Sequence, residues 1–219
     1  MPYKLSPSLL NLMEECQRCF WLQLNSGISR PDGIFPSLPS GMDRVLKAHF
    51  DSFRDRKALP PELHGVDAQL FSNTELLDVW RNNRKGIQFN DDKGNLIKGA
   101  VDDVLQKGSK LIVLDFKTRG FPVKEDTASH SQLQLDVYNF LLRKAGYETE
   151  DYAYLLFYMP KEVGKAGEFI FNSELIKMAT SIQNAERAIA KALELLSGKL
   201  PEVNDQFQFC KWSGMEGVG

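Results

Sequence analysis

The feature that most constrains this chain is a pair of apolar segments joined by a short polar turn. The first segment contains Gly99-Ala-Val-Asp102, and the second covers residues 111–116. The turn between them, Lys107-Gly-Ser-Lys110, matches a two-residue hairpin loop formed by its glycine and serine. The two segments are therefore predicted to pair as an antiparallel hairpin in which Lys107 faces Lys110.

In this register Asp102 lies opposite Asp115. Directly opposed residues have Cβ atoms about 5 Å apart, and two like charges at that separation destabilise a sheet. A divalent cation relieves the repulsion, because Mg²⁺ and Mn²⁺ prefer oxygen ligands such as carboxylates. Lys117 projects from the same face as Asp115, whereas the Phe116 side chain points to the other face and leaves its backbone carbonyl near the ion.

These groups suit the hydrolysis of a phosphodiester. The carboxylates hold the ion, the ion polarises the phosphate and lowers the pKa of a water, and Lys117 orients that water or stabilises developing charge. In the alternative interpretation, Asp102 and Asp115 are ordinary strand-end residues and Lys117 is a solvated neighbour. The adjoining apolar residues favour the metal site, because carboxylates aligned across buried strands are costly without a partner.

Turn signals and hydrophobic periodicity divide the chain into helices and strands. The order α, α, β, β, β, α, β, β, α predicts an α/β fold, with a central mixed sheet that contains an antiparallel meander and is flanked by helices. We expect one domain over residues 1–219, with a mainly helical part (1–86), a sheet core that carries the site (87–172), and a helix and tail (173–219). The predicted elements are a helix capped by Ser6 over residues 7–24, a loop over 27–41 that ends in a cap near Ser40, a helix over 42–53, a polar connector over 55–65, strands over 87–89, 96–105 and 111–116, a helix over 129–144, strands over 152–159 and 169–171, and a helix over 174–196.

The charge balance limits the kind of partner. The chain has 27 Lys and Arg residues against 29 Asp and Glu residues, and its net charge of −2 excludes a global electropositive field. It shows neither a signal peptide nor an apolar run that can span a bilayer. With only 3 cysteines, which a reducing compartment keeps available for metals or cores, we expect a soluble, cytoplasmic protein with no membrane partner.

The hairpin motif ends in Leu114-Asp115-Phe-Lys117-Thr, and Gln134-Leu-Asp-Val-Tyr138 follows in the next predicted helix. Together with Gly99-Ala-Val-Asp102, this combination resembles the PD-(D/E)XK nuclease superfamily, in particular the branch of the bacterial recombination helicase-nucleases and the CRISPR-associated spacer-processing exonucleases. The resemblance covers residues 6–212. It implies a restriction-endonuclease-like core, Asp102 and Asp115 as metal ligands, Lys117 as the catalytic lysine, and Gln134 and Tyr138 near the DNA backbone.

Two helical positions have alternative interpretations. Gln134 and Tyr138 share a helix face, where an amide and a phenol can together address a phosphate, but a tyrosine there also suits half-buried packing. His49 lies on the apolar face of its predicted helix, among Phe50 and Phe53. It is either a core residue or a third metal ligand, a role that the resemblance implies for a histidine in this helix.

The cysteines form a separate candidate site. Cys16-Gln-Arg-Cys19 lies near the start of the chain and Cys210 lies near its end. A zinc ion or an iron–sulfur cluster takes four ligands, and the three thiols leave one position open. Either another residue completes a metal site, or the staple between the two ends has become hydrophobic packing beside Phe209 and Trp212.

Local basic residues offer contacts for DNA. Arg84, Lys85 and Arg119 adjoin predicted strands and can bind phosphates without reading the base sequence. We therefore expect a Mg²⁺- or Mn²⁺-dependent DNA nuclease, by resemblance an exonuclease, that acts on single-stranded or free-ended DNA in repair, recombination or CRISPR adaptation, within a larger complex. The alternative hypotheses are a catalytically silent DNA-binding or assembly module of the same fold and a cysteine-ligated metal-cluster protein.

Overall fold

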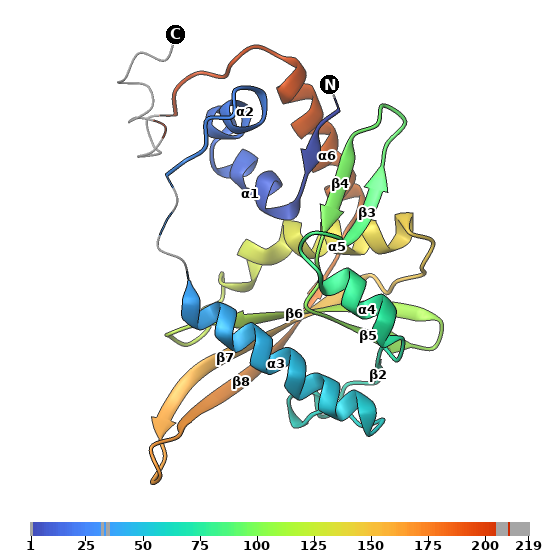
Figure 1. The fold of residues 1–219 in the computed structure, drawn as a ribbon, viewed down its shortest axis with the longest axis vertical. Helices are drawn as coiled ribbons and strands as arrows, with labels where there is room; N and C mark the ends of the chain where they lie inside the picture. Colours follow the sequence, from blue (N-terminus) through green and yellow to red (C-terminus); the bar gives the residue numbers. More distant parts are fainter. Residues whose placement is uncertain (1, 32, 34–35, 205–209, 211–219) are drawn as a thin grey trace.

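The computed structural model describes residues 2–31, 33, 36–204 and 210 (Figure 1). These residues form a three-stranded sheet in the order β1-β4-β3 and a five-stranded mixed sheet in the order β2-β5-β6-β7-β8. The predicted α/β class is confirmed. The helices and strands, in chain order, are β1 (Lys4–Leu5), α1 (Pro7–Glu15), α2 (Gln17–Asn25), α3 (Ser37–Asp55), β2 (Gln69–Leu70), α4 (Thr74–Arg81), β3 (Ile87–Asn90), β4 (Leu96–Gly99), β5 (Asp103–Lys107), β6 (Lys110–Thr118), α5 (Gln132–Lys144), β7 (Tyr152–Val163), β8 (Phe169–Ala179) and α6 (Ile182–Ser197).

The hairpin of β5 and β6 has the predicted register. Lys107 pairs with Lys110, and Asp103 pairs with Leu114. Gly108 adopts a φ of 59°, a left-handed conformation that glycine tolerates best. The prediction of one strand over residues 96–105 is wrong, because the chain bends between β4 and β5 and passes from the three-stranded sheet into the five-stranded one.

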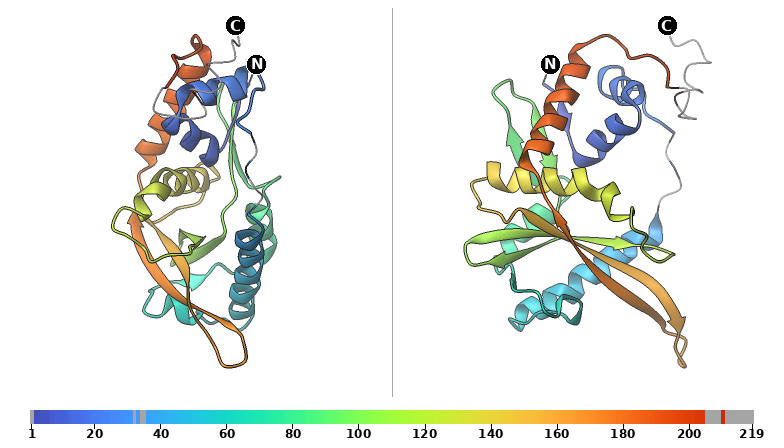
Figure 2. Two further views of the ribbon diagram at one scale, coloured as in Figure 1. Left: turned by 90° about the vertical axis from the view of Figure 1, so that its left-hand side faces the viewer. Right: turned by 180° about the vertical axis from the view of Figure 1, so that it is seen from behind.

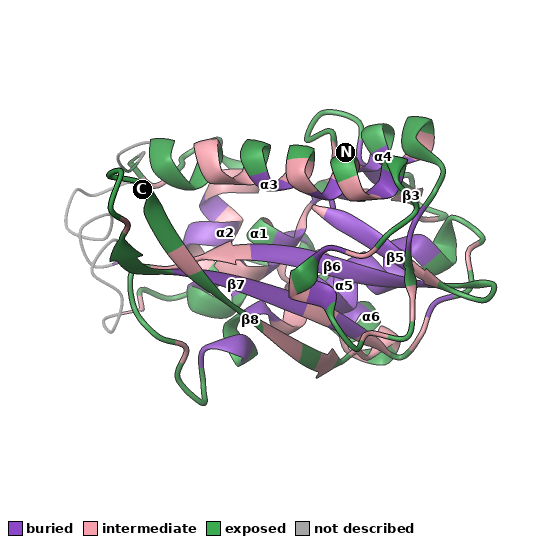
Figure 3. Ribbon diagram, turned by 90° about the horizontal axis from the view of Figure 1, so that it is seen from below, coloured by how far each residue is buried: buried purple, intermediate pink, exposed green. Residues whose placement is uncertain are grey.

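Both faces of the five-stranded sheet are covered. Ile112 and Leu114 are buried in a cluster with Leu46 and Phe50 of α3, whereas Val113 belongs to a larger cluster that includes side chains of α5 and α6. Alternate residues of β6 therefore face different helices, as the pleat of a strand requires. Figure 3 shows α3 lying along its face of the sheet.

Helix α5 lies between the five-stranded sheet and a second layer. It contacts β6 as well as α1, α6 and β3, and both figures place α1, α2 and the three-stranded sheet beyond it (Figures 1 and 2). Strand β1 pairs in parallel with β4, which ties the start of the described chain to this layer. None of the helices in the described ranges is long and apolar enough to cross a membrane.

The first predicted helix is divided in two. Ser6 caps it as expected, but α1 ends at Glu15 and α2 begins at Gln17. Between them, Cys16 has an extended backbone, and its thiol accepts a hydrogen bond from the Cys19 backbone N–H over 3.4 Å. The break therefore serves as the cap of α2, a role that the helical periodicity did not indicate.

The next region holds elements that the sequence did not predict. Helix α3 begins at Ser37, before the expected cap near Ser40, because the first turn of a helix tolerates Pro39. Helix α4 was missed, although Asn73 caps it and Leu77 and Trp80 are buried on one face. As predicted, the polar connector is not a continuous helix: α3 ends at Asp55, and the residues after it contain a 3₁₀ turn at Pro61–Leu63.

The last hairpin is longer than predicted. Strand β7 continues past Pro160 to Val163, and β8 includes residues 174–179, which the periodicity assigned to a helix. Pairing with β7 decides the conformation of this segment, and a register shift between Pro160 and Glu162 accommodates the proline. Helix α6 consequently starts at Ile182, where the side chain of Ser181 caps it.

Candidate active site

Asp102 lies one residue beyond the paired part of the β5–β6 hairpin. Its Oδ2 accepts a hydrogen bond of 2.8 Å from the backbone N–H of Phe116, in a place where a backbone carbonyl would continue the ladder. Its Oδ1 lies 3.3 Å from Nζ of Lys47 on α3. Strand β6 and helix α3 therefore each contact one oxygen of this carboxylate.

Asp115 is more deeply buried, with 2% of its surface exposed. Nζ of Lys117 lies 2.7 Å from its Oδ2. The same amine donates a 2.8 Å hydrogen bond to Oε1 of Gln134, whose Nε2 donates one of 2.9 Å to the Tyr138 hydroxyl. Lys117 therefore projects from the same face as Asp115, as predicted, and a continuous polar chain runs from β6 to α5.

Both acids have raised pKa values. Burial raises the pKa of Asp102 to about 7, and the charge of Asp115 adds to the increase, while the Lys47 ammonium and the Phe116 N–H oppose it. Burial also raises the pKa of Asp115, against the opposing influence of Lys117 and Lys47. Ionisation of both carboxylates is therefore unfavourable, and a bound proton or cation stabilises the pair.

The donor set fits a divalent cation. Asp102 and Asp115 supply hard oxygen ligands at one end of the hairpin, and positive groups already lie against both of them. Hard oxygen donors of this kind suit Mg²⁺ or Mn²⁺ rather than a thiophilic metal. The chemistry of these residues therefore fits a divalent metal ion.

Gly99 makes room for the Tyr138 ring. A Cβ atom at position 99 would lie 2.8 Å from Cε1 of Tyr138, closer than carbon atoms pack. Tyr138 is 6% exposed, and burial raises the pKa of its phenol well above the ordinary value. Its hydroxyl thus keeps its proton, and the packing role and the polar role considered for Tyr138 coincide in one side chain.

An arginine pair that the sequence interpretation missed holds the backbone beside Asp102. The guanidinium of Arg81 donates a 2.8 Å hydrogen bond to the Asp102 carbonyl and another of 2.8 Å to the Asp103 carboxylate. Arg54 of α3 also donates to Asp103, which is completely buried. A charge that is fully buried requires such partners, so these contacts fix the bend that presents Asp102.

The residues that helix α3 contributes to the site do not include His49, the histidine considered in the sequence analysis. The His49 ring lies 3.2 Å from Oε1 of Glu62 and packs edge-on against Phe50 and Phe53. The structure does not bring His49 together with Asp102 and Asp115. Lys47 and Asp43 lie beside the acids instead. These two residues share a helix face one turn apart, whereas His49 follows Lys47 by two residues and therefore projects from a different side of α3.

The remaining predicted residues are distributed around this centre. The Phe116 side chain contacts α3, on the other face from Lys117 and α5, with its ring centroid 4.8 Å from that of Phe50. Arg119 is half-buried just after β6, and its backbone N–H donates to the Tyr158 carbonyl. Arg84 and Lys85 are exposed in the turn after α4, where the side chain of Asn82 accepts from both backbone N–H groups.

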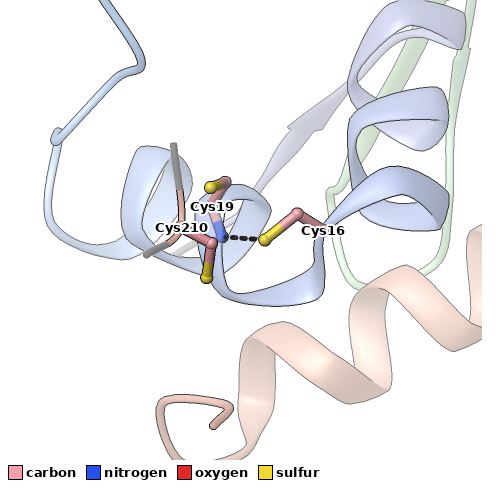
Figure 4. A group of neighbouring side chains, drawn as sticks. All are labelled: Cys16, Cys19 and Cys210. Carbon is pink, nitrogen blue, oxygen red and sulfur yellow. Dashed lines mark hydrogen bonds between the residues drawn. The ribbon is translucent and has the colours of Figure 1, made fainter. Parts of the chain in front are cut away.

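The three cysteines come together at a second position. Their sulfur atoms all lie within 4.8 Å of one another, and all three residues are buried (Figure 4). Burial raises the pKa of Cys19 to about 11 and also raises the pKa of Cys210. Burial also acts to raise the pKa of Cys16. Hydrogen bonds to its thiol, of which the one from the Cys19 backbone is the strongest, outweigh burial, so the pKa of Cys16 is lowered. Phe209 and Trp212, the predicted packing partners, are outside the described residues.

The chain matches one protein family over most of its length. Residues 36–212 match the sequence model of the PD-(D/E)XK nuclease superfamily, a range that includes the hairpin, α5 and Cys210 but not Cys16 and Cys19. A solved structure, "Crystal structure of SSO0001", is similar at 15% sequence identity with a TM-score of 0.42, and the alignment covers 100% of this chain and 87% of that one. No curated protein matches the chain.

Proposed function

Because the chain belongs to the PD-(D/E)XK nuclease superfamily, we propose that it is a Mg²⁺- or Mn²⁺-dependent deoxyribonuclease that acts as an exonuclease on single-stranded or free-ended DNA. The observation that supports this most directly is the juxtaposition of Asp102, Asp115 and Lys117. Two buried acids beside a held amine form a site for phosphodiester hydrolysis. The contact of Lys117 with Gln134 of α5 supports the proposal further, because the sequence motif contains both residues.

In the proposed mechanism, Asp102, Asp115 and the backbone carbonyl of Phe116 would hold the metal ion. When bound, the ion supplies Lewis acidity that polarises the scissile phosphate and lowers the pKa of a water. Lys117 donates a hydrogen bond to that water or to the phosphate oxygen on which negative charge develops. Asp115 and Gln134 position the Lys117 amine at distances of 2.7 and 2.8 Å.

The α5 residues extend the site toward the DNA backbone. Tyr138 is a proton donor held by packing against Gly99, and its hydroxyl accepts from Gln134. Through Gln134, a phosphate bound near α5 is coupled to the position of the Lys117 amine. Arg84, Lys85 and Arg119 supply further phosphate contacts without base readout, which makes the binding of DNA non-specific and sensitive to salt.

We also propose a biological setting for the nuclease. It would serve DNA repair, recombination or CRISPR adaptation, and it would act in the cytoplasm within a larger complex. Co-purification from native cells with a helicase or an integrase supports this part, and a monomeric protein that shows full activity on its own opposes it.

The test of the nuclease activity uses end-labelled single-stranded, duplex and flapped DNA. The wild type is expected to release nucleotides from the ends with Mn²⁺ or Mg²⁺ and to be inactive with a chelator. Asp115→Ala and Lys117→Ala are expected to abolish the reaction, while Lys165→Ala, in the exposed turn between β7 and β8, retains it. Equal activity of Lys117→Ala and wild type contradicts the mechanism, and DNA binding without cleavage by wild type supports the silent module instead.

The convergence of Cys16, Cys19 and Cys210 favours a second candidate function. We propose that these thiols bind zinc or an iron–sulfur cluster, with a further group completing the ligand set, and thereby link Cys210 to α2. Quantification of zinc, iron and sulfide in anaerobically purified protein tests this. One equivalent of metal that disappears in Cys16→Ser is the expected result, and metal at background level in the wild type contradicts it.

A further inference from the structure

A lysine of α3 lies in the position where the acid pair needs a cation. Nζ of Lys47 is 3.3 Å from Oδ1 of Asp102 and 2.8 Å from the carboxylate of Asp43, which lies one helical turn earlier. Its charge also acts on Asp115, whose pKa it lowers. The Lys47 side chain is 21% exposed, so water screens these interactions only in part.

The two oxygens of Asp102 are not equivalent. Oδ2 is engaged by the Phe116 N–H, which belongs to the rigid sheet. Oδ1 faces the ammonium group of Lys47, which sits at the end of a long, flexible side chain. A divalent ion that binds Asp102 therefore meets the Lys47 ammonium at the oxygen that is easier to free, and two cations at this oxygen repel each other strongly.

Building on the proposed function, we infer that Lys47 is an intramolecular counter-ion that a divalent cation displaces from Asp102 toward Asp43. The displaced ammonium keeps a partner, because its 2.8 Å ion pair with Asp43 belongs to α3 alone. Lys47 compensates the buried acids while no ion is bound. It also competes with the ion, and so sets the divalent concentration at which the site fills.

The test is calorimetric titration of the whole chain with MnCl₂ and no DNA. The titration is done at about pH 8, above the pKa of about 7 of Asp102, so that this carboxylate is mostly ionised before the metal binds. Lys47→Met is expected to bind Mn²⁺ roughly five- to tenfold more tightly than wild type, the equivalent of one partly buried ion pair. Arg44→Met, which removes an exposed charge from the same helix, is expected to bind as wild type does. Circular dichroism establishes that each variant is folded.

The remaining variants separate this inference from the proposed function. Asp115→Asn is expected to lose Mn²⁺ binding; if it binds as wild type does, the metal site itself is refuted. If Asp115→Asn loses binding but Lys47→Met binds no more tightly than wild type, the site stands and the counter-ion role is wrong. Asp43→Asn is expected to weaken binding in wild type and to have no effect in Lys47→Met, whereas a loss in both makes Asp43 a ligand and overturns its role as the acceptor of Lys47.

Discussion

The carboxylate site and the cysteine cluster are built in opposite ways. Asp115 lies in β6 and Asp102 one residue before β5, so the register of a single hairpin places the two acids close enough for the charge of Asp115 to act on Asp102. Cys16 and Cys19 lie at the start of α2 and Cys210 lies near the far end of the chain, so only tertiary packing brings their sulfurs within 4.8 Å of one another. One cluster offers hard donors inside the fold and the other offers soft donors that join distant segments.

Because of this difference, we expect the two clusters to respond independently to substitutions. A change in the hairpin alters oxygen donors and leaves the thiols untouched, and a change in the thiols alters a link between segments and leaves the hairpin register intact. Effects on distant sites with no shared partners add nearly independently. Four substitutions test that separation.

Asp115→Ala separates the clusters most strongly. We expect the nuclease rate to fall by at least roughly 10³-fold, because the substitution removes a ligand at the reacting centre. The metal bound by the cysteines should remain at the wild-type level. Single-turnover cleavage of end-labelled DNA and metal analysis of the same preparation measure both quantities, and a joint loss of activity and thiol-bound metal would show that the clusters are coupled.

Gly99→Ala tests how closely the hairpin site depends on packing. The added methyl group meets the Tyr138 ring at 2.8 Å, so we expect the free energy of unfolding to fall by about 1–3 kcal/mol, as overpacked cores do. Chemical denaturation measures the change. The matched control is Gly120→Ala, since a Cβ there meets nothing within 4 Å; equal stability of the two variants would disprove the close fit of Tyr138.

The raised pKa of Asp102 predicts the pH dependence of the metal-free protein. Between about pH 5 and pH 7 the folded protein holds a proton that the unfolded chain has released, so its stability falls as pH rises. Asp102→Asn should remove about 1–2 kcal/mol of this dependence across the interval. Urea unfolding of both proteins at several pH values, with a chelator present, measures the difference, and parallel curves would contradict the raised pKa.

Cys19→Ser is expected to have the smallest effect on activity. The exchange removes one thiol from the cluster and leaves the hairpin unchanged, so metal at the cysteines is lost while the nuclease rate stays within about twofold of wild type. Metal analysis together with the cleavage assay checks this. A rate that falls along with the thiol-bound metal would mean that the link between the segments supports the active site.

The sequence predicted the hairpin site better than its surroundings, for a physical reason. The register of β5 and β6 follows from a two-residue turn, and the spacing of Asp115 and Lys117 follows from the period of a strand. Both are local properties. The contact of Gln134 with Lys117, and that of Tyr138 with Gln134, required only that α5 cover this face of the sheet.

The missed residues depend on contacts between distant segments. The approach of Lys47 to Asp102 and the contact of Arg54 with Asp103 are set by where α3 packs, and the apolar pattern of that helix favoured His49 instead. Residues 174–179 have a helical pattern but become strand, because the open edge of β7 satisfies their backbone hydrogen bonds. Buried Asp103 next to Asp102 was a usable signal, since a charge inside a strand predicts an arginine partner.

Anomalous diffraction from a crystal of the wild-type protein, soaked in MnCl₂ without DNA, tests directly whether Asp102 and Asp115 form the metal site. We predict a manganese peak coordinated by oxygens of Asp102 and Asp115, with the Lys47 ammonium turned toward Asp43. A peak at the cysteines alone, or acids that remain paired with Lys47 and Lys117 at saturating Mn²⁺, would contradict the assignment of this hairpin as the metal site.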